Sequence, residues 1–154
     1  MNVLELLIND HEKVSELFEQ VKATEDRAKH QQLFEQIKQE LEVHAHIEEA
    51  VFYPALQGKG NQELTDIVLE GIEEHHQAKM FLREISNLSD DSEKFDAKLK
   101  VLMEDVEHHV DEEENEMFPL VEEVFEESEL DALGRELEAE KQTFKKSYQA
   151  GAGR

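Results

Sequence analysis

Cysteine is absent from the 154 residues of this chain. Its absence excludes disulfide bonds, thiolate metal sites, iron–sulfur clusters held by this chain and cysteine nucleophiles. Long apolar runs are absent too: no stretch approaches the ~18 consecutive apolar residues of a transmembrane helix. The N-terminal stretch MNVLELLINDHEK has neither a basic start nor a small-residue cleavage site, so we expect no secretory signal. These absences are compatible with the cytosol, and we expect a cytoplasmic protein without a membrane partner.

Positive charge is scarce. The chain has 16 lysine and arginine residues against 39 acidic residues, and its formal net charge is −23. A surface of this sign repels phosphate backbones and anionic lipid, which argues against nucleic-acid and membrane partners. The same field attracts cations. Solubility alone explains most of the acidic residues, whereas a metal site would use only a few of them.

Helix-breaking residues are also rare, with two prolines and six glycines. Apolar residues recur at helical spacing nearly throughout, and no alternating strand pattern of useful length appears. The sequence therefore predicts an all-α protein. The expected helices span residues 3–24, 30–56 and 62–87, a fourth helix that starts after an N-cap at Ser92, and residues 129–149.

Short connections and a sustained three–four alternation favour antiparallel helices that pack at a shallow angle. We expect an up-down-up-down four-helix bundle over residues 1–127. Residues 128–154 form an additional C-terminal helix and a tail in the same domain. This fifth helix lies along the bundle or joins a partner, and Gly134 weakens it.

Each of the first four helices carries a histidine in phase with its core residues, and two of them add a glutamate four residues later. Residues at i and i+4 share one helix face, so each pair points the same way. Burial of six such groups without partners costs at least several kcal/mol. A metal ion offsets this cost directly, and bundle cores hold di-metal carboxylate sites. The predicted metal ligands are His11, His44, Glu48, His75, His109 and Glu113.

The alternative is a core network of hydrogen-bonded polar groups. A single such residue would favour that alternative, but six in phase with a repeated His-x-x-x-Glu favour metal. We expect the other four histidines to be mostly solvated, because His30 lies near a helix start, whereas His46, His76 and His108 fall away from the apolar stripes.

Four stretches between residues 8 and 121 carry a family resemblance: NDHEKVSELF, HAHIEEAVFYPAL, EHHQAKMFLREI and HHVDEEENEMFPLV. Two of them contain His-x-x-x-Glu-Glu, with a proline ten residues after the histidine. With these motifs the chain resembles the hemerythrin-like family, also called HHE cation-binding domains. The resemblance implies an up-down-up-down bundle with two irons bridged by carboxylates and an oxo or hydroxo group. It assigns Glu48 and Glu113 as bridges, His11 and His44 to one iron, and His75 and His109 to the other.

The chain departs from the oxygen-carrying members at one place. Their third helix presents His-x-x-x-His, whereas this chain has His75 and Lys79. Protonated lysine is a poor ligand, so the second iron has an open position or another group reaches it. Lys79 either donates a proton or hydrogen bond to a bound ligand or extends to solvent along its stem. Tyr53 either lines the cavity or serves only in packing.

The expected function is a soluble non-haem di-iron protein that binds or reacts with dioxygen, or with nitric oxide or peroxide, in sensing or oxidative-stress defence. Oxidase- or peroxidase-like chemistry is left open. One alternative is a metal-handling or storage module for iron, zinc or manganese. Another is an interaction protein that works through the fifth helix, including a homodimer formed by it.

Overall fold

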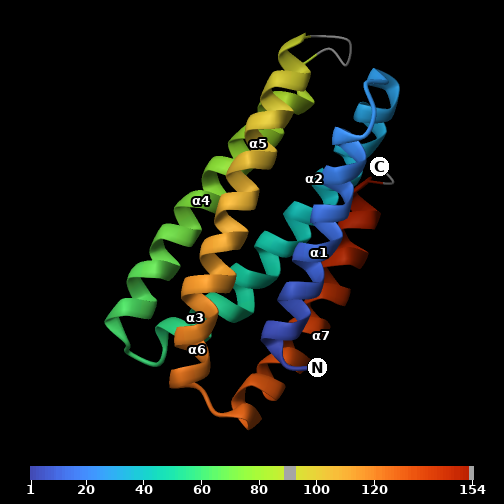
Figure 1. The fold of residues 1–154 in the computed structure, drawn as a ribbon. Coiled ribbons are helices and arrows are strands. Elements are labelled where there is room, and N and C mark those ends of the chain that lie inside the picture. Colours follow the sequence, from blue (N-terminus) through green and yellow to red (C-terminus); the bar gives the residue numbers. More distant parts are fainter. Residues whose placement is uncertain (89–92, 153–154) are drawn as a thin grey trace.

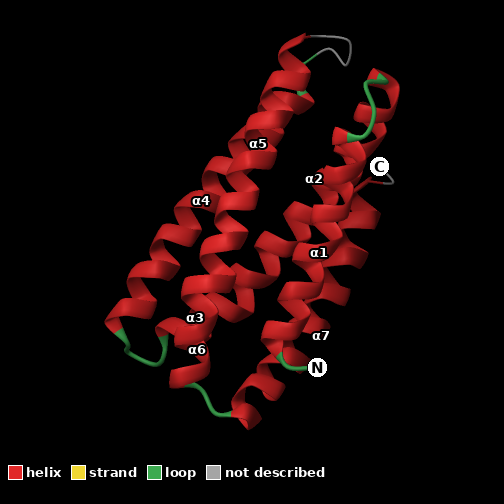
Figure 2. Ribbon diagram, viewed as in Figure 1, coloured by secondary structure: helices red, strands yellow, loops and turns green. Residues whose placement is uncertain are grey.

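Helices make up all of the regular structure that the computed structural model describes, which comprises residues 1–88 and 93–152 (Figures 1 and 2). The all-α prediction is therefore confirmed. In chain order the elements are α1 (Val3–Lys22), α2 (Arg27–Ile47), the π-helical turn η1 (Glu48–Phe52), α3 (Tyr53–Gln57), α4 (Gln62–Ser86), α5 (Glu93–Glu112), the π-helical turn η2 (Glu113–Met117), α6 (Phe118–Val124) and α7 (Glu127–Ala152). The predicted N-cap at Ser92 lies outside the described residues.

The long helices pack lengthwise. Helix α1 packs against α2, and α4 packs against α5 (Figure 1). Helix α7 returns along α1 and α2, so the fifth helix lies along its own chain, which was one of the two predicted arrangements. Among the described residues, no helix is both long and apolar enough to cross a membrane.

Gly134 allows α7 to approach the start of α1. A Cβ atom at this position would lie 2.6 Å from the backbone oxygen of Met1, which is too close for any other residue. Beside this contact, the side-chain amide of Asn2 donates to Glu127 over 3.3 Å. The prediction that Gly134 merely weakens the helix therefore misses its role, which is to bring the two helices into close contact.

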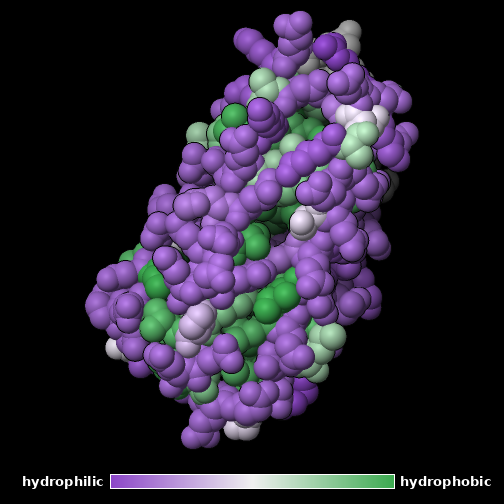
Figure 3. All heavy atoms as spheres, viewed as in Figure 1, coloured by the Kyte–Doolittle hydropathy of each residue, from purple (hydrophilic) through white to green (hydrophobic). Residues whose placement is uncertain are grey.

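Two apolar clusters fill the interior, one toward each end of the helices. One contains Leu7, Phe52 and Val68, and the other contains Phe34 and Phe95. Buried polar side chains occupy the region between them, and the outer face in view is mostly hydrophilic (Figure 3). The fold therefore places a polar site between two apolar layers that shield it from water.

His30 is buried, so the prediction that it is solvated is wrong. Its Nδ1 lies 2.9 Å from Asp96 Oδ1, and its Nε2 lies 2.6 Å from the carbonyl oxygen of Thr24. All its partners are acceptors, so both ring nitrogens carry hydrogen. Burial lowers the pKa of His30, but the hydrogen bonds from the ring outweigh burial and raise it above its ordinary value. His46 is half-buried against α7, whereas His76 and His108 are exposed as predicted.

His30 is expected to make the stability depend on pH. Its pKa is higher in the folded than in the unfolded chain, so its contribution is complete below the unfolded value of about 6.5 and is lost as pH rises through the folded value. The Tm of the wild type should therefore fall between pH 6 and pH 8.5 by more than that of His30→Gln. His76→Gln removes an exposed histidine and should follow the wild type. Parallel curves for wild type and His30→Gln would contradict the assignment.

Candidate metal centre

The six predicted ligands meet between the two apolar clusters. Their potential ligand atoms form two groups, within each of which all the atoms lie within 4.8 Å of one another: His11, His44, Glu48 and Glu113 in one, and Glu48, His75, His109 and Glu113 in the other. Glu48 and Glu113 belong to both groups and are 0% and 1% exposed. The structure thus brings together all six side chains around two adjacent positions that share two carboxylates. Their role as ligands stays a prediction.

Both shared glutamates begin a π-helical turn that a proline follows. The amide of Tyr53 donates to the carbonyl of Glu48, and that of Phe118 donates to the carbonyl of Glu113, five residues back in each case. Pro54 is the next residue after Tyr53, and proline has no amide hydrogen and clashes with the preceding turn of an α-helix. The helical turn that begins at each glutamate therefore contains one residue more than an α-helical turn. Such π-bulges often occur at functional sites.

Each of the four histidines is held by a carboxylate on its Nδ1 atom. The distances are 2.6 Å for His11–Glu114, 3.1 Å for His44–Asp10, 2.8 Å for His75–Glu49 and 2.6 Å for His109–Glu74. With Nδ1 as the donor, Nε2 remains as the acceptor that faces the centre. A carboxylate on the outer nitrogen is the usual arrangement around metal-bound histidine.

Sequence reasoning missed these four carboxylates. Each is the chain neighbour of a predicted ligand: Asp10 of His11, Glu49 of Glu48, Glu74 of His75 and Glu114 of Glu113. Each nevertheless bonds a histidine from another helix, which only the packing decides. One feature of the sequence could have indicated them: acid–histidine and Glu–Glu dipeptides recur at corresponding places in the two halves of the chain.

The residues present fit metal ions. Six buried side-chain nitrogen and oxygen atoms in the described residues lack a hydrogen-bond partner. Five of them are at this centre: Nε2 of His11, His44 and His109, Oε2 of Glu48 and Oε1 of Glu113. Buried polar atoms without partners are costly. Imidazole nitrogens and carboxylate oxygens are donors that divalent first-row metals accept, so cations between them would satisfy these atoms.

The electrostatics favour positive charge at the centre. Burial lowers the pKa of His44 and of His109, but the neighbouring carboxylates outweigh it and raise these pKa values to about 10 and about 11. Burial raises the pKa of Glu113, yet the imidazoles of His109 and His11, whose Nε2 atoms lie 3.2 Å from its carboxylate oxygens, hold that pKa well below its usual range. Protons therefore compete with metal ions for these side chains, because metal binding requires neutral imidazole.

Tyr53 does more than pack, because its hydroxyl reaches the centre. The hydroxyl donates to Glu113 Oε2 over 2.7 Å and lies 3.4 Å from His75 Nε2. A Cβ atom on Gly71 would lie 2.9 Å from this hydroxyl, so the glycine leaves space for it. Phe118 occupies the corresponding position before the second proline and stacks on His11. The residue before the proline therefore brings a hydroxyl to the centre in the first segment and an apolar ring in the second.

Lys79 extends away from the ligands. Its side chain is 48% exposed, and its Nζ lies 3.4 Å from Glu49 Oε2, the oxygen that also bonds His75 Nδ1. Its predicted hydrogen bond or proton transfer to a bound ligand stays a prediction. The amine contacts the outer carboxylate rather than a ligand position.

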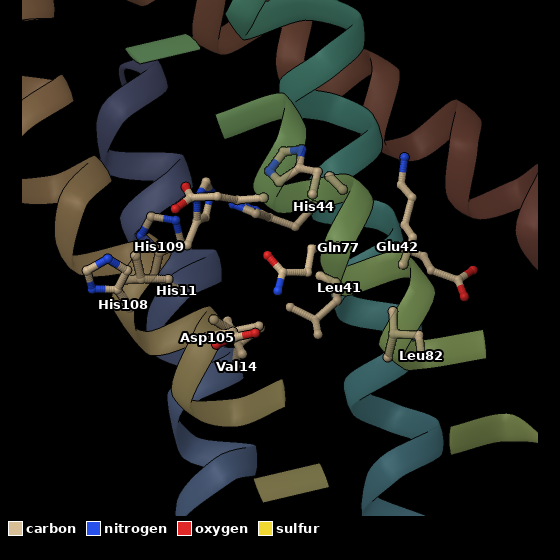
Figure 4. Close-up of a pocket in the computed structure, with 17 residues that line it drawn as sticks. His11, Val14, Leu41, Glu42, His44, Gln77, Leu82, Asp105, His108 and His109 are labelled. Carbon is tan, nitrogen blue, oxygen red and sulfur yellow. The ribbon is translucent and has the colours of Figure 1, made fainter. Parts of the chain in front are cut away.

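A cavity of about 140 Å³ adjoins the centre (Figure 4). All four histidines line it, and apolar side chains such as Val14, Leu41 and Val106 form much of the rest. A wider surface groove between α2, α4 and α7 shares Leu82 and Lys79 with this cavity. The cavity is therefore a small, largely apolar space beside the Nε2 atoms.

An all-helical fold with two such groups in its interior has the donor set of a helical cation-binding protein. The Hemerythrin HHE cation binding domain model matches residues 2–121, and this chain belongs to that family. A crystal structure of a hemerythrin HHE cation-binding domain-containing protein from Mycobacterium kansasii is 25% identical and superposes with a TM-score of 0.81, covering 96% of this chain and 89% of that one. The predicted family resemblance is confirmed.

A curated relative from Nostoc sp. is named DNA nickase. It is 33% identical over 125 residues, which is 79% of this chain but 34% of that protein. This chain therefore spans about a third of the relative's length. The absence of a nucleic-acid partner stays a prediction based on net charge.

Proposed function

We propose that this chain is a non-haem di-iron protein that binds or reacts with a small diatomic ligand. Dioxygen is the first candidate, followed by nitric oxide and by peroxide, in sensing or oxidative-stress defence. Support comes from two adjacent groups of two histidines each that share Glu48 and Glu113. In this proposal helices α1, α2, α4 and α5 form the up-down-up-down bundle of the family, and Glu48 and Glu113 would hold both irons as shared ligands.

The apolar cavity beside the histidines is the reason for proposing a small diatomic ligand. Its volume of about 140 Å³ suits a small molecule rather than a large organic substrate. Side chains such as Val14, Leu41 and Leu82 offer no hydrogen bonds, so an uncharged diatomic molecule loses little on entering. When bound, iron supplies a redox couple and open coordination positions.

The chain's own residues orient the site and exclude water from it. The outer carboxylates fix the tautomer of each histidine, so that all four Nε2 atoms face inward. The hydroxyl of Tyr53 donates a hydrogen bond to Glu113 Oε2, and the two oxygen atoms lie 2.7 Å apart. Burial and the nearby carboxylates raise the pKa of Tyr53 well above its ordinary value, so the phenol stays protonated.

The reaction with dioxygen tests this proposal. With four histidines rather than five, more coordination remains open, which favours chemistry over reversible binding. Stopped-flow absorbance of the reduced iron-loaded protein mixed with dioxygen should show fast oxidation that removal of oxygen does not reverse. Lys79 lies one helical turn after His75 and lines the cavity, so Lys79→His should restore the fifth histidine and make the change more reversible.

The control is Lys79→Gln, which removes the amine without adding a ligand and should oxidise like the wild type. A stable, reversible spectrum in the wild type would contradict the proposal. An unchanged spectrum on mixing with dioxygen would favour the metal-handling alternative, in which the centre holds iron, zinc or manganese without redox chemistry.

A third group of side chains offers a test of that alternative. Glu74, His108 and Glu112 bring potential ligand atoms within 4.8 Å of one another at the surface, and Glu74 also bonds His109. A metal-handling protein would bind cations at this outer group as well. Equilibrium dialysis with zinc should then exceed two ions per chain, and His108→Ala should remove only the excess.

A further inference from the structure

Helix α7 reaches the metal centre although it lies beyond the residues that the family model matches. Lys141 on α7 places its Nζ 2.6 Å from Asp10 Oδ1. The other oxygen of Asp10 lies 3.1 Å from His44 Nδ1. A continuous line of contacts therefore runs from α7 through Asp10 to one of the four histidines.

Lys141 meets a carboxylate that needs a partner. Asp10 is 8% exposed, and a buried carboxylate is stable only when its oxygens are paired and hydrogen-bonded. His44 satisfies one oxygen and Lys141 the other, through a charge-assisted hydrogen bond. The side chain of Glu74, which holds His109 in the corresponding way, is 25% exposed against 11% for Asp10, so water reaches it more readily.

Other residues of α7 pack in the core and against α2 close to His44. Leu130 and Leu137 are buried in the core. Two residues beyond His44, the ring of His46 stacks on Phe144 at a centroid distance of 4.0 Å, and its Nε2 lies 2.7 Å from Glu140. Helix α7 thus contacts α2 at His46 and, through Asp10, at His44.

We propose that Lys141 is a positioning residue that fixes Asp10 and thereby the imidazole of His44. By this contact the docking of α7 sets the affinity of the cation position formed by His11, His44, Glu48 and Glu113. The inference rests on the metal centre of the proposed function. It adds a determinant outside the matched domain, whereas the comparable contact at the other position, from Lys79 to the Glu49 carboxylate that holds His75, lies within that domain.

Cobalt(II) binding tests the inference without redox activity. Titration of the metal-free protein against a chelator of known cobalt affinity, followed by visible absorption, gives both affinities and the number of ions. Lys141→Met keeps the stem but removes the charge, and should weaken one of two ions by about ten-fold, the lower end of the range for outer-shell partners. Lys141→Arg keeps a cation and should stay close to the wild type. Lys146→Met, on an exposed part of the same helix, is the matched control.

A double-mutant cycle distinguishes an effect of Lys141 through Asp10 from a general effect of its positive charge on metal affinity. In the Asp10→Asn background, Lys141→Met should cause no further loss, because the lysine acts through Asp10. An equal loss in both backgrounds, or a loss with Lys146→Met as large as with Lys141→Met, would overturn the inference. Wild-type affinity in Lys141→Met would overturn it while leaving the proposed function intact. A wild type that binds no cobalt would overturn both.

Discussion

Glu48→Ala or Glu113→Ala is expected to abolish the binding of both metal ions. Each glutamate belongs to both groups of potential ligands, so either substitution removes a donor from the two positions at once. Loss of an outer-shell partner alone costs 10–100-fold in metal affinity, so loss of a shared ligand should exceed about 100-fold. Metal content after dialysis against a weak chelator measures the effect.

Neighbouring glutamates provide graded controls. Glu112 pairs with the exposed His108 and does not belong to either buried group, so Glu112→Ala should retain both ions. Glu49 bonds His75 Nδ1, and Glu49→Ala should lose metal to an intermediate degree. The expected order of metal retention is therefore wild type and Glu112→Ala, then Glu49→Ala, then Glu48→Ala and Glu113→Ala. Equal losses for Glu112→Ala and Glu113→Ala would refute the assignment.

Removal of metal should lower the melting temperature substantially. Ions that bind only the folded chain stabilise it by mass action, by about 4 kcal/mol at a free concentration 1,000 times the dissociation constant. For a chain of this size each kcal/mol corresponds to a Tm shift of roughly 2–4 °C, so a fall of about 8–16 °C is expected. Calorimetry with and without a chelator, and after readdition of metal, measures it.

The physical reason lies in the atoms that the ions would satisfy. Without metal, Nε2 of His44 and Oε2 of Glu48 are buried and have no hydrogen-bond partner. The variant Glu113→Ala is the control, since it should melt at the same temperature with and without chelator. Identical melting of the wild type under both conditions would show that metal contributes nothing to stability.

Helical periodicity determined the fold class and the six candidate ligands. Residues four apart share a helix face whatever the helix packs against, so His44 with Glu48 and His109 with Glu113 are visible as pairs in the sequence. Identical spacing from each histidine to Pro54 and Pro119 marked the two corresponding segments. The location of the π-helical turns at these segments was not predicted, although both prolines were visible.

Contacts between helices were decided only by the tertiary structure. Asp10 bonds His44 rather than its neighbour His11, because a carboxylate pairs with whatever the adjacent helix presents. His30 lies near the start of α2, yet the carbonyl oxygens of Val21 and Thr24 and the carboxylate of Asp96 on α5 surround it.

The position of the fifth helix was likewise decided only by the tertiary structure. Glycine has a low intrinsic helix propensity, but Gly134 is the residue that allows α7 to lie close to the backbone of Met1. Lys141 then lies 131 positions from Asp10 in the chain and 2.6 Å from it in space. Periodicity states which residues share a face, whereas packing alone states which faces meet.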